Sequence, residues 1–436
     1  MSPRALPVPA LSAAVAVAVL SAACTASPAR ERMSARASSP AGTDASPATP
    51  EASEAGFRGA WDYLYPDHPS GRHRPVTLPV DESGPWRLRL VADYGVFDLV
   101  SCVVATAPGS AWAFGTDGRW RGRLVALRWD GTRWTRYAWD RRADPVAAAA
   151  SGPDDVWLLL REAHRGQVLH WDGVRWAPVG GGASFFRLGS AGRGRAWALN
   201  GRESAVWLSD GGPWRRVPGP GAGIPQVLSV SASGTYWAIN DDRRRQGLRT
   251  ALYRGAPGGR WQPVAFGGAL PKDTAENSLQ LQGVVAASDA DVWAYGTYGT
   301  RPDPEEHSDL VRHPVAAHWD GRAWRAVAVP NGWRFTDAAV PDGRGGLRVV
   351  VASTTGDEDA VEAETAVLSL TPAGLATPAG PRIPGGRVVL RGLARVPGTH
   401  RFWAVGAAFP AATEMSASTS VIYGWRPSTP STPSTP

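Results

Sequence analysis

Short apolar runs with a tryptophan near the middle recur along this chain, and polar turns separate them. Asp155-Val156-Trp157-Leu158 and Asp291-Val292-Trp293-Ala294 are two examples. Apolar runs bounded by turn residues are typical of β-strands. The repeats are spaced 40 to 56 residues apart, and their anchors are Trp112, Trp157, Trp197, Trp237, Trp293, the apolar run near Val349, and Trp403.

The clearest repeats continue into a hairpin of the form Trp-Asp-Gly-x-x-Trp, at residues 129–134, 171–176 and 319–324. An Asp-Gly pair between two strands is a strong hairpin signal, because glycine tolerates the positive φ of a tight turn. Seven repeats of this length predict an all-β fold, a seven-bladed β-propeller of four-stranded blades. We expect the repeated tryptophans to pack between blades rather than to bind sugars.

The two ends of the repeat array predict how the ring closes. The last repeat ends near Trp425 without a fourth strand, and Gly84-Pro85-Trp86 mirrors Gly212-Pro213-Trp214 of the third repeat. We therefore expect an N-terminal strand beginning at Trp86 to complete the last blade, which leaves no open sheet edge.

The unit Val-Trp-Ala-x-Gly followed by Trp-Asp-Gly-x-x-Trp resembles the kelch repeat of galactose-oxidase-like propellers, over about residues 75–426. The resemblance implies the propeller fold. Galactose oxidase itself uses copper held by Tyr and His ligands and a Tyr–Cys crosslink. No matching ligand set is evident here, so we carry over no catalytic residue and expect no cofactor.

The N-terminus predicts secretion. Residues 1–23 combine one charge, Arg4, with an apolar run and small residues, as in a signal peptide. Ala22-Ala23-Cys24 resembles the bacterial lipobox, which implies a lipid on Cys24 and anchoring to the outer side of the cytoplasmic membrane. Ordinary signal cleavage near Ala23 is the alternative.

The remaining organisation follows from composition. Residues 24–56 are rich in Ala, Ser, Pro and Thr and predict a flexible tether, 57–74 form an aromatic connecting segment, 75–426 form the propeller, and 427–436 form a disordered Ser/Thr/Pro tail. Cys102 lies on an expected inner strand, where we expect a buried, inert thiol.

The net charge of +7 comes almost entirely from arginines scattered over many repeats, with Lys272 as the only lysine. This scatter argues against nucleic acid as a partner. We expect a monomer, because a closed ring leaves no sheet edge to pair.

The strand order separates short, uniform turns on one face of the ring from variable loops on the other, where binding residues concentrate on rigid scaffolds. The variable loops of the first four repeats are basic, whereas those of the next two are acidic, although charge runs on loops are often only solvated. Trp333 lies on the same face. The candidate partner-binding residues are Arg121, Arg123, Arg161, Arg165, Arg243, Arg244, Arg245, Arg249 and Trp333.

Signals for catalysis are weak. His307, Asp309 and His313 are close enough in sequence to be metal ligands, but they have no recognised ligand spacing, so we predict neither a metal site nor a catalytic residue. Two function classes stay open. The preferred one is a non-enzymatic, membrane-tethered binding module for an envelope protein or glycan. The alternative is an extracytoplasmic carbohydrate-active hydrolase, lyase or oxidase.

Overall fold

A computed structural model describes most of the propeller region. Contacts divide the chain into Met1–Ala48 and Thr49–Pro436, and every described residue lies in the second unit. Cys24 and the segments before Gly84 lie outside the described residues, as does the tail after Arg426. The described residues are 84–92, 99–117, 123–137, 139, 141–162, 165–181, 184–221, 223–242, 249–256, 258–274, 277–300, 311–354, 364–409 and 419–426.

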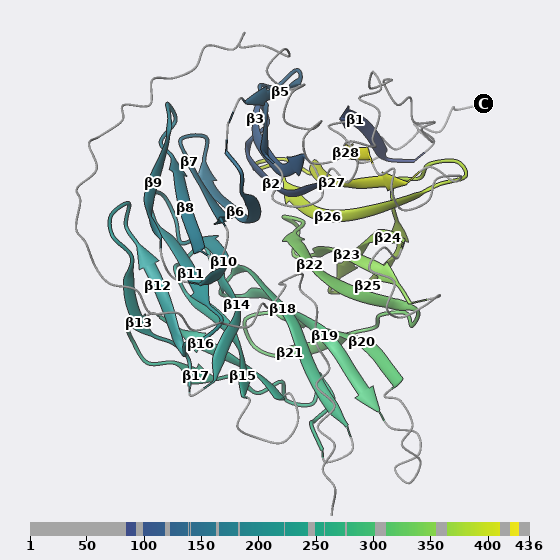
Figure 1. Cartoon of the computed structure of the whole chain (residues 1–436). Helices are drawn as coiled ribbons and strands as arrows, with labels where there is room; N and C mark the ends of the chain where they lie inside the picture. Colours follow the sequence, from purple (N-terminus) through teal and green to yellow (C-terminus); the bar gives the residue numbers. More distant parts are fainter. Residues whose placement is uncertain are drawn as a thin grey trace, which may run out of the picture. The chain divides into compact units, whose positions relative to one another are not determined.

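The described residues form seven sheets of four antiparallel strands, arranged in a ring (Figure 1). From the inner strand outward, blade one consists of β2 (Leu99–Ala107), β3 (Ser110–Asp117), β4 (Arg123–Trp129) and β5 (Trp134–Tyr137). Blade two consists of β6 (Asp144–Gly152), β7 (Asp155–Glu162), β8 (Arg165–Trp171) and β9 (Trp176–Gly181). Blade three consists of β10 (Phe185–Ser190), β11 (Ala196–Asn200), β12 (Ala205–Ser209) and β13 (Arg215–Pro218).

Blade four consists of β14 (Ile224–Val230), β15 (Tyr236–Asp242), β16 (Arg249–Gly255) and β17 (Gln262–Pro263). Blade five consists of β18 (Ser278–Ser288), β19 (Asp291–Thr300), β20 (Val311–Trp319) and β21 (Trp324–Val327). Blade six consists of β22 (Trp333–Pro341), β23 (Leu347–Ser353), β24 (Thr365–Thr371) and β25 (Gly374–Ala379). Blade seven consists of β26 (Arg387–Arg395), β27 (Phe402–Phe409), β28 (Thr419–Trp425) and, outermost, β1 (Trp86–Ala92).

The predicted closure of the ring is confirmed. Strand β1 pairs antiparallel with β28, so that Trp86 lies opposite Trp425. The backbone N–H of Arg426 donates to the carbonyl of Pro85 at 3.1 Å. Trp86 is 3% exposed and belongs to the core of blade seven, so this non-covalent contact also buries a large apolar side chain. The last blade thus has its fourth strand from the other end of the repeat array.

The repeated tryptophans lie between blades, as predicted. Trp112, Trp157, Trp237 and Trp293 are each at most 1% exposed. Their core clusters combine neighbouring blades, and the cluster around Trp112 includes Leu158 of blade two. Apolar area removed from water in these seams is the main favourable term for the stability of the ring.

The second strand of blade six lies at the apolar run near Val349, as predicted, but an arginine stands where other blades have the anchor tryptophan. In blade five the anchor Trp293 lies on the second strand, opposite Val285 of the first strand and His318 of the third. The equivalent position of blade six is Arg348, opposite Val340 and Ser369. The guanidinium of Arg348 stacks over Trp425 at 3.9 Å and Phe402 at 4.8 Å from the ring centroids. A cation–π contact replaces an apolar ring at this seam. Burial lowers the pKa of Arg348, and the charge of Asp342 opposes that shift.

Candidate functional site

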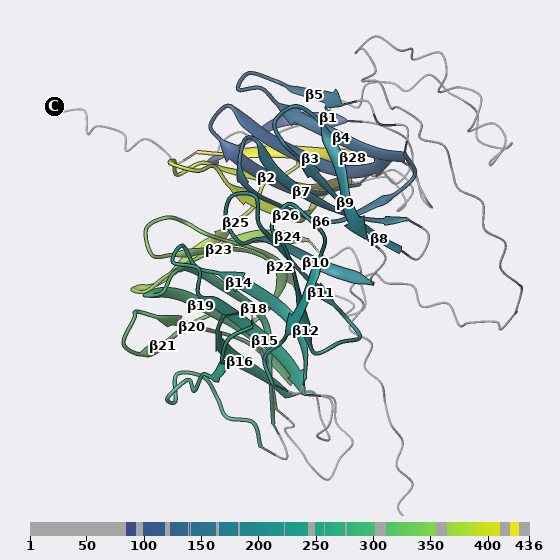
Figure 2. The ribbon, with the colours of Figure 1, turned by 90° about the vertical axis from the view of Figure 1, so that its left-hand side faces the viewer.

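The two faces of the ring carry different connections between strands. The turns that join the first strand to the second and the third to the fourth lie together on one face, here called the turn face. The other connections lie on the opposite face, here called the loop face. Figure 2 shows the ring from the side, with the β20–β21 turn at its left edge. Most of the loop-face segments that join second and third strands lie outside the described residues.

The aspartates of the Trp-Asp-Gly turns serve the fold. Asp130 accepts hydrogen bonds from the backbone N–H groups of Thr132 and Arg133 at 2.8 and 2.9 Å, and Asp172 and Asp320 make the same pair of bonds. The hydroxyl of Thr132, followed by these N–H groups, lowers the pKa of Asp130 to about 2. The glycine after each aspartate has a φ of +89° to +100°, which explains the Asp-Gly signal in the sequence.

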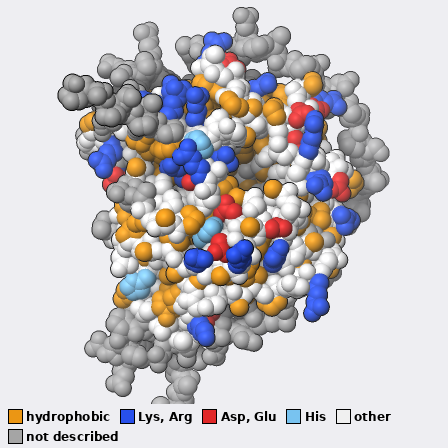
Figure 3. Space-filling view, turned by 180° about the vertical axis from the view of Figure 1, so that it is seen from behind, with side chains coloured by type: hydrophobic (Ala, Val, Ile, Leu, Met, Phe, Trp, Pro, Cys, Tyr) orange, Lys and Arg blue, Asp and Glu red, His pale blue; other side chains and the backbone are white. Residues whose placement is uncertain are grey.

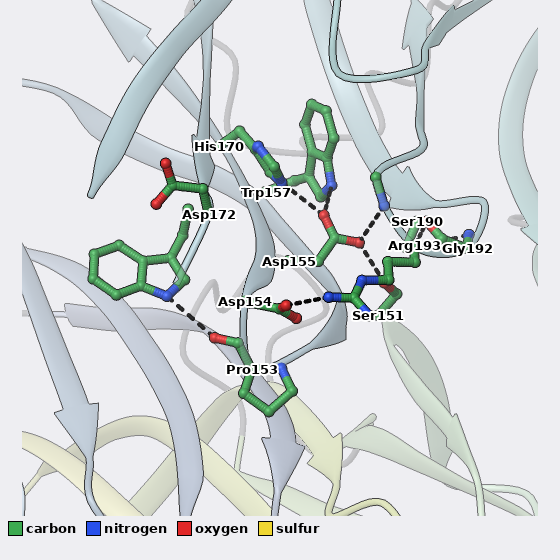
Figure 4. A network of polar contacts seen from close by, with 12 residues as sticks. Ser151, Pro153, Asp154, Asp155, Trp157, His170, Asp172, Ser190, Gly192 and Arg193 are labelled. Carbon is green, nitrogen blue, oxygen red and sulfur yellow. Dashed lines mark hydrogen bonds and ion pairs between the residues drawn. The ribbon is translucent and has the colours of Figure 1, made fainter. Parts of the chain in front are cut away.

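A buried polar network occupies the turn-face end of blade two (Figure 4). Asp155 accepts hydrogen bonds from Nε1 of Trp157 at 2.8 Å, from the N–H of Gly194 in the next blade at 2.9 Å, and from Ser151. Nε2 of His170 lies 2.7 Å from the same carboxylate, and the imidazole stacks on Trp157 at 4.2 Å. Burial alone would raise the pKa of Asp155, but these hydrogen bonds outweigh it and lower the pKa.

Blade five repeats part of this arrangement: His318 Nε2 lies 2.9 Å from Asp291, and its ring packs on Trp293 at 4.6 Å, but Nε1 of Trp293 donates to the carbonyl of Gly345. The residue types are those of a hydrolytic triad, but in blade two the carboxylate lies between the serine and the histidine. Ser151 therefore donates to Asp155 and not to His170, so the imidazole is not placed to take its proton as in a triad. We conclude that these groups hold neighbouring strands together and position the indole rings of the anchor tryptophans. These residues are absent from the predicted set, although an Asp two residues before the anchor Trp and a His before Trp-Asp-Gly occur together in both repeats.

The seven inner strands share an irregularity at the loop-face end of the ring. In six of them the pairing with the second strand skips one residue, and in β22 it skips Thr336, Asp337 and Ala338. In flat strands side chains face the neighbouring blades, whereas a bulge can re-aim a side chain. The residues at this level are Ser101, Val146, Phe186, Gln226, Gln282, Asp337 and Arg391.

An ion pair crosses the axis at this level. Nη2 of Arg187, next to the bulge of blade three, lies 2.6 Å from Oδ2 of Asp337 in blade six. Blades three and six are not neighbours, so these side chains meet only across the centre of the ring. Nε of Arg187 and Oε1 of Gln282 are buried and have no hydrogen-bond partner among the described residues. Polar groups are thus concentrated in the channel near the loop face.

A second polar group lies at the loop-face ends of blades one and two. Arg123 forms a backbone bridge with Arg142, and Arg141 contacts Glu162 and Gln167 through its guanidinium. Asp144 pairs with Arg161 along the strands, and Glu162 pairs with Arg165. Asp117 pairs with Arg123 in the same way, so that five arginines and three acidic residues lie together here. Arg142 and Arg165 are exposed, and we call this set of five arginines the arginine cluster.

The structure brings three of the predicted binding residues, Arg123, Arg161 and Arg165, into this cluster. It places Arg249 in blade four, opposite Asp242. Trp333 begins β22 and is half-buried against the core between blades five and six. Arg141 and Arg142 were missed, because they belong to a connection between blades that the sequence did not single out. Arg121 and Arg243 to Arg245 lie outside the described residues.

The candidate metal ligands are not assembled in the part that the structure describes. Nδ1 of His313 lies 3.3 Å from Oδ1 of Asn331, and His307 and Asp309 lie outside the described residues. Among the described residues no group of three or more His, Cys, Asp or Glu side chains could hold a metal ion. Burial raises the pKa of Cys102 to about 11, and a hydrogen bond with Ser101 opposes that shift, so its thiol stays protonated at neutral pH.

Comparison with known proteins concerns the fold. No protein-family model matches the chain, nor does any curated protein. The chain is similar to solved structures of YCF48 bound to a D1 peptide (14% identity, TM-score 0.47, covering 80% of this chain and 99% of that one) and of the β-propeller domain of Myceliophteria thermophila Cps50 (Swd1) (11%, 0.44, 78% and 99%). It is also similar to the SapL1 lectin in complex with α-methyl fucoside (15%, 0.40, 67% and 97%). These similarities assign no ligand to this chain.

Proposed function

We propose that the chain is a lipid-tethered, extracytoplasmic binding propeller, without catalytic activity, that uses its loop face to bind an acidic protein or glycan of the cell envelope. The observation that carries the proposal is the arginine cluster of blades one and two. Five arginines at one edge of a rigid ring, with three acidic residues among them, leave an excess of positive charge. Such a surface attracts acidic partners and increases their association rate.

The channel supports the same choice of face. Among its bulge residues near the loop-face end, Asp337 and Arg391 are exposed, whereas the other described ones are half-buried. On the turn face, the aspartates of the Trp-Asp-Gly turns accept hydrogen bonds that stabilise those turns. On the loop face, the charged side chains are not part of the repeated pattern. The kelch-like character of the repeat remains a resemblance and adds no residue to this site.

The carbohydrate-active alternative has no specific observation in its favour. Glycoside hydrolysis commonly uses two carboxyl groups on either side of the scissile bond. Among the described bulge residues the channel offers Asp337 as its carboxylate, and Arg187 pairs with it. We therefore propose binding alone.

Partner capture tests the face. We expect Arg142→Ser with Arg165→Ser to reduce capture of an acidic partner from envelope extract, and to lower the salt concentration that elutes it, because exposed charges act through a screened field. Arg175→Ser with Arg322→Ser is the matched control, since it removes the same charge from exposed turns of the opposite face. Equal capture by both variants and the unmodified chain would contradict the proposed site.

Membrane fractionation tests the anchor. The lipobox-like Ala22-Ala23-Cys24 motivates the proposal, and two acyl chains give stable membrane attachment where one does not. Cys24→Ser should release the chain from membranes or leave it unprocessed. A variant that fractionates and migrates like the unmodified chain would show that Cys24 carries no lipid.

A further inference from the structure

The turn-face corner of blade seven carries a group of arginines on three adjacent strands. Arg87 and Arg89 lie on β1, Arg426 directly follows β28, and Arg401 directly precedes β27. Trp425 pairs with Trp86 on one side and with Phe402 on the other, so Arg87, Arg426 and Arg401 lie at the same end of the sheet. We call these four residues the basic corner. Figure 3 shows the turn face, on which basic side chains gather in several groups.

Within the part of the chain that the structure describes, the basic corner has no carboxylate partner, unlike Arg193 and Arg254 on the same face. Blades one, two, three, five and six each place an aspartate in these turns, and Asp289 of blade five reaches Arg254 of blade four at 3.8 Å. The corresponding turn of blade seven, residues 395–401, contains no acid in its sequence. Within the described residues, none of the four arginines forms an ion pair with a carboxylate. Asp81 and Glu82 precede the described segment.

The charges of the other three arginines act on Arg426. The charge of Arg401, burial, and the charges of Arg89 and Arg87 together lower the pKa of Arg426. Arg89, Arg401 and Arg426 are all exposed. Arg87 is half-buried, and its guanidinium donates to the carbonyl of Trp86 at 3.0 Å. Like charges held this close oppose folding unless an anion binds to them.

The same corner is where the chain enters and leaves the ring. The N–H of Arg426 donates to the carbonyl of Pro85, so the two ends of the repeat array meet there. The tether from Cys24, on the proposed function, joins the ring at β1. A tether holds a weak electrostatic site at high effective concentration near the surface to which it is attached.

We propose that the basic corner docks on the anionic phospholipid headgroups of the membrane to which the chain is tethered, so that the loop face points away from the bilayer. The inference extends the proposed function, since the tether supplies proximity, but the contact itself requires only arginines and lipid phosphates. Arginine forms charge-assisted hydrogen bonds with phosphate. Basic residues at an anionic surface each contribute on the order of a fivefold factor in binding.

Vesicle flotation tests the contact without acylation. The full chain carrying Cys24→Ser is mixed with vesicles of phosphatidylcholine alone or with added phosphatidylglycerol. Neutral vesicles report any contribution of the apolar N-terminal segment. We expect binding to the anionic vesicles that falls as salt rises. The triple variant Arg89→Ser, Arg401→Ser, Arg426→Ser should lose on the order of tenfold to a hundredfold in binding.

The matched control is Arg133→Ser, Arg175→Ser, Arg322→Ser, which removes the same charge from exposed turns of the same face, and it should change binding less than about twofold. Arg401→Glu, a single change in an exposed turn, keeps the test valid if the triple variant does not fold. Equal binding to neutral and anionic vesicles, or equal losses in both triple variants, would overturn the proposal. Binding to soluble polyphosphate without binding to anionic vesicles would also overturn it. None of these results depends on acylation of Cys24 or on partner capture.

Discussion

Asp155 on the turn face and Asp337 in the channel are both aspartates near the inner edge of the ring, but their surroundings differ. The Asp155 side chain is 2% exposed and accepts hydrogen bonds from two blades, whereas the Asp337 side chain is 55% exposed and meets one arginine across the axis. Asp155 belongs to the repeat, and Asp337 belongs to a three-residue irregularity in one strand. Asp155 thus serves the fold, whereas more than half of the Asp337 side chain remains accessible to a ligand.

The largest expected effect comes from the ring closure at blade seven. Trp86→Ala should lower the free energy of unfolding by about 3–5 kcal/mol, because it removes a buried ring from the non-covalent strand β1. Urea unfolding followed by tryptophan fluorescence measures the change. A loss below about 1 kcal/mol would mean that β1 does not close the ring in solution.

The next effect tests the comparison of the two aspartates directly. Asp155→Ala should cost about 3 kcal/mol, because the donors of Trp157 and Gly194 lose their acceptor in a buried setting. Asp337→Ala should cost less than about 1 kcal/mol, because its ion pair is largely solvated. Similar losses for the two variants, measured by the same urea titration, would remove the distinction between structural and available aspartates.

Arg348→Ala should have a smaller effect, about 1–2 kcal/mol, through loss of its stacking on Trp425 and Phe402. Arg348→Lys keeps the charge but not the planar stack, so it should recover part of the loss. Chemical denaturation of both variants provides the measurement. If the lysine variant were the less stable of the two, the cation–π account of this seam would be wrong.

The smallest effect is acid sensitivity of the turn face. The folded-state pKa of Asp130 is about 2, below its ordinary value of 3.8, so the stability it contributes is present above pH 3.8 and is lost as the pH falls through about 2. Hydrogen bonds from the turn backbone likewise lower the pKa of Asp172 and Asp320. The triple variant Asp130→Asn, Asp172→Asn, Asp320→Asn should therefore lose less thermal stability than the unmodified chain between about pH 4 and pH 2. If the melting temperatures of the two proteins fell equally over this pH window, the prediction would be wrong.

The fold was largely predictable because each repeat contains local sequence signals for its turns and its buried strand. Trp-Asp-Gly turns, anchor tryptophans and the Gly-Pro-Trp mirror near Trp86 all correspond to features that the structure contains. Arg348 was missed because an arginine at an anchor position does not match an apolar pattern, although its aliphatic part and planar head pack as a ring would.

The site was less predictable, because it depends on contacts between distant segments. The bulges and the Arg187–Asp337 pair depend on how the seven inner strands are arranged around the axis. Arg187 and Asp337 are 150 residues apart along the chain, so no local sequence pattern connects them. Arg141 and Arg142 join Arg123 only through the bridge between blades. The predicted loop arginines, Arg243 to Arg245, lie outside the described residues and stay a prediction.

Amide hydrogen exchange, with and without the captured envelope partner, tests the choice of face most directly. We predict slower exchange at residues 141–144 and 165–168, where the arginine cluster lies, and unchanged exchange at the turns 130–133 and 172–175. Protection confined to the turns, with none at the arginine cluster, would contradict the account.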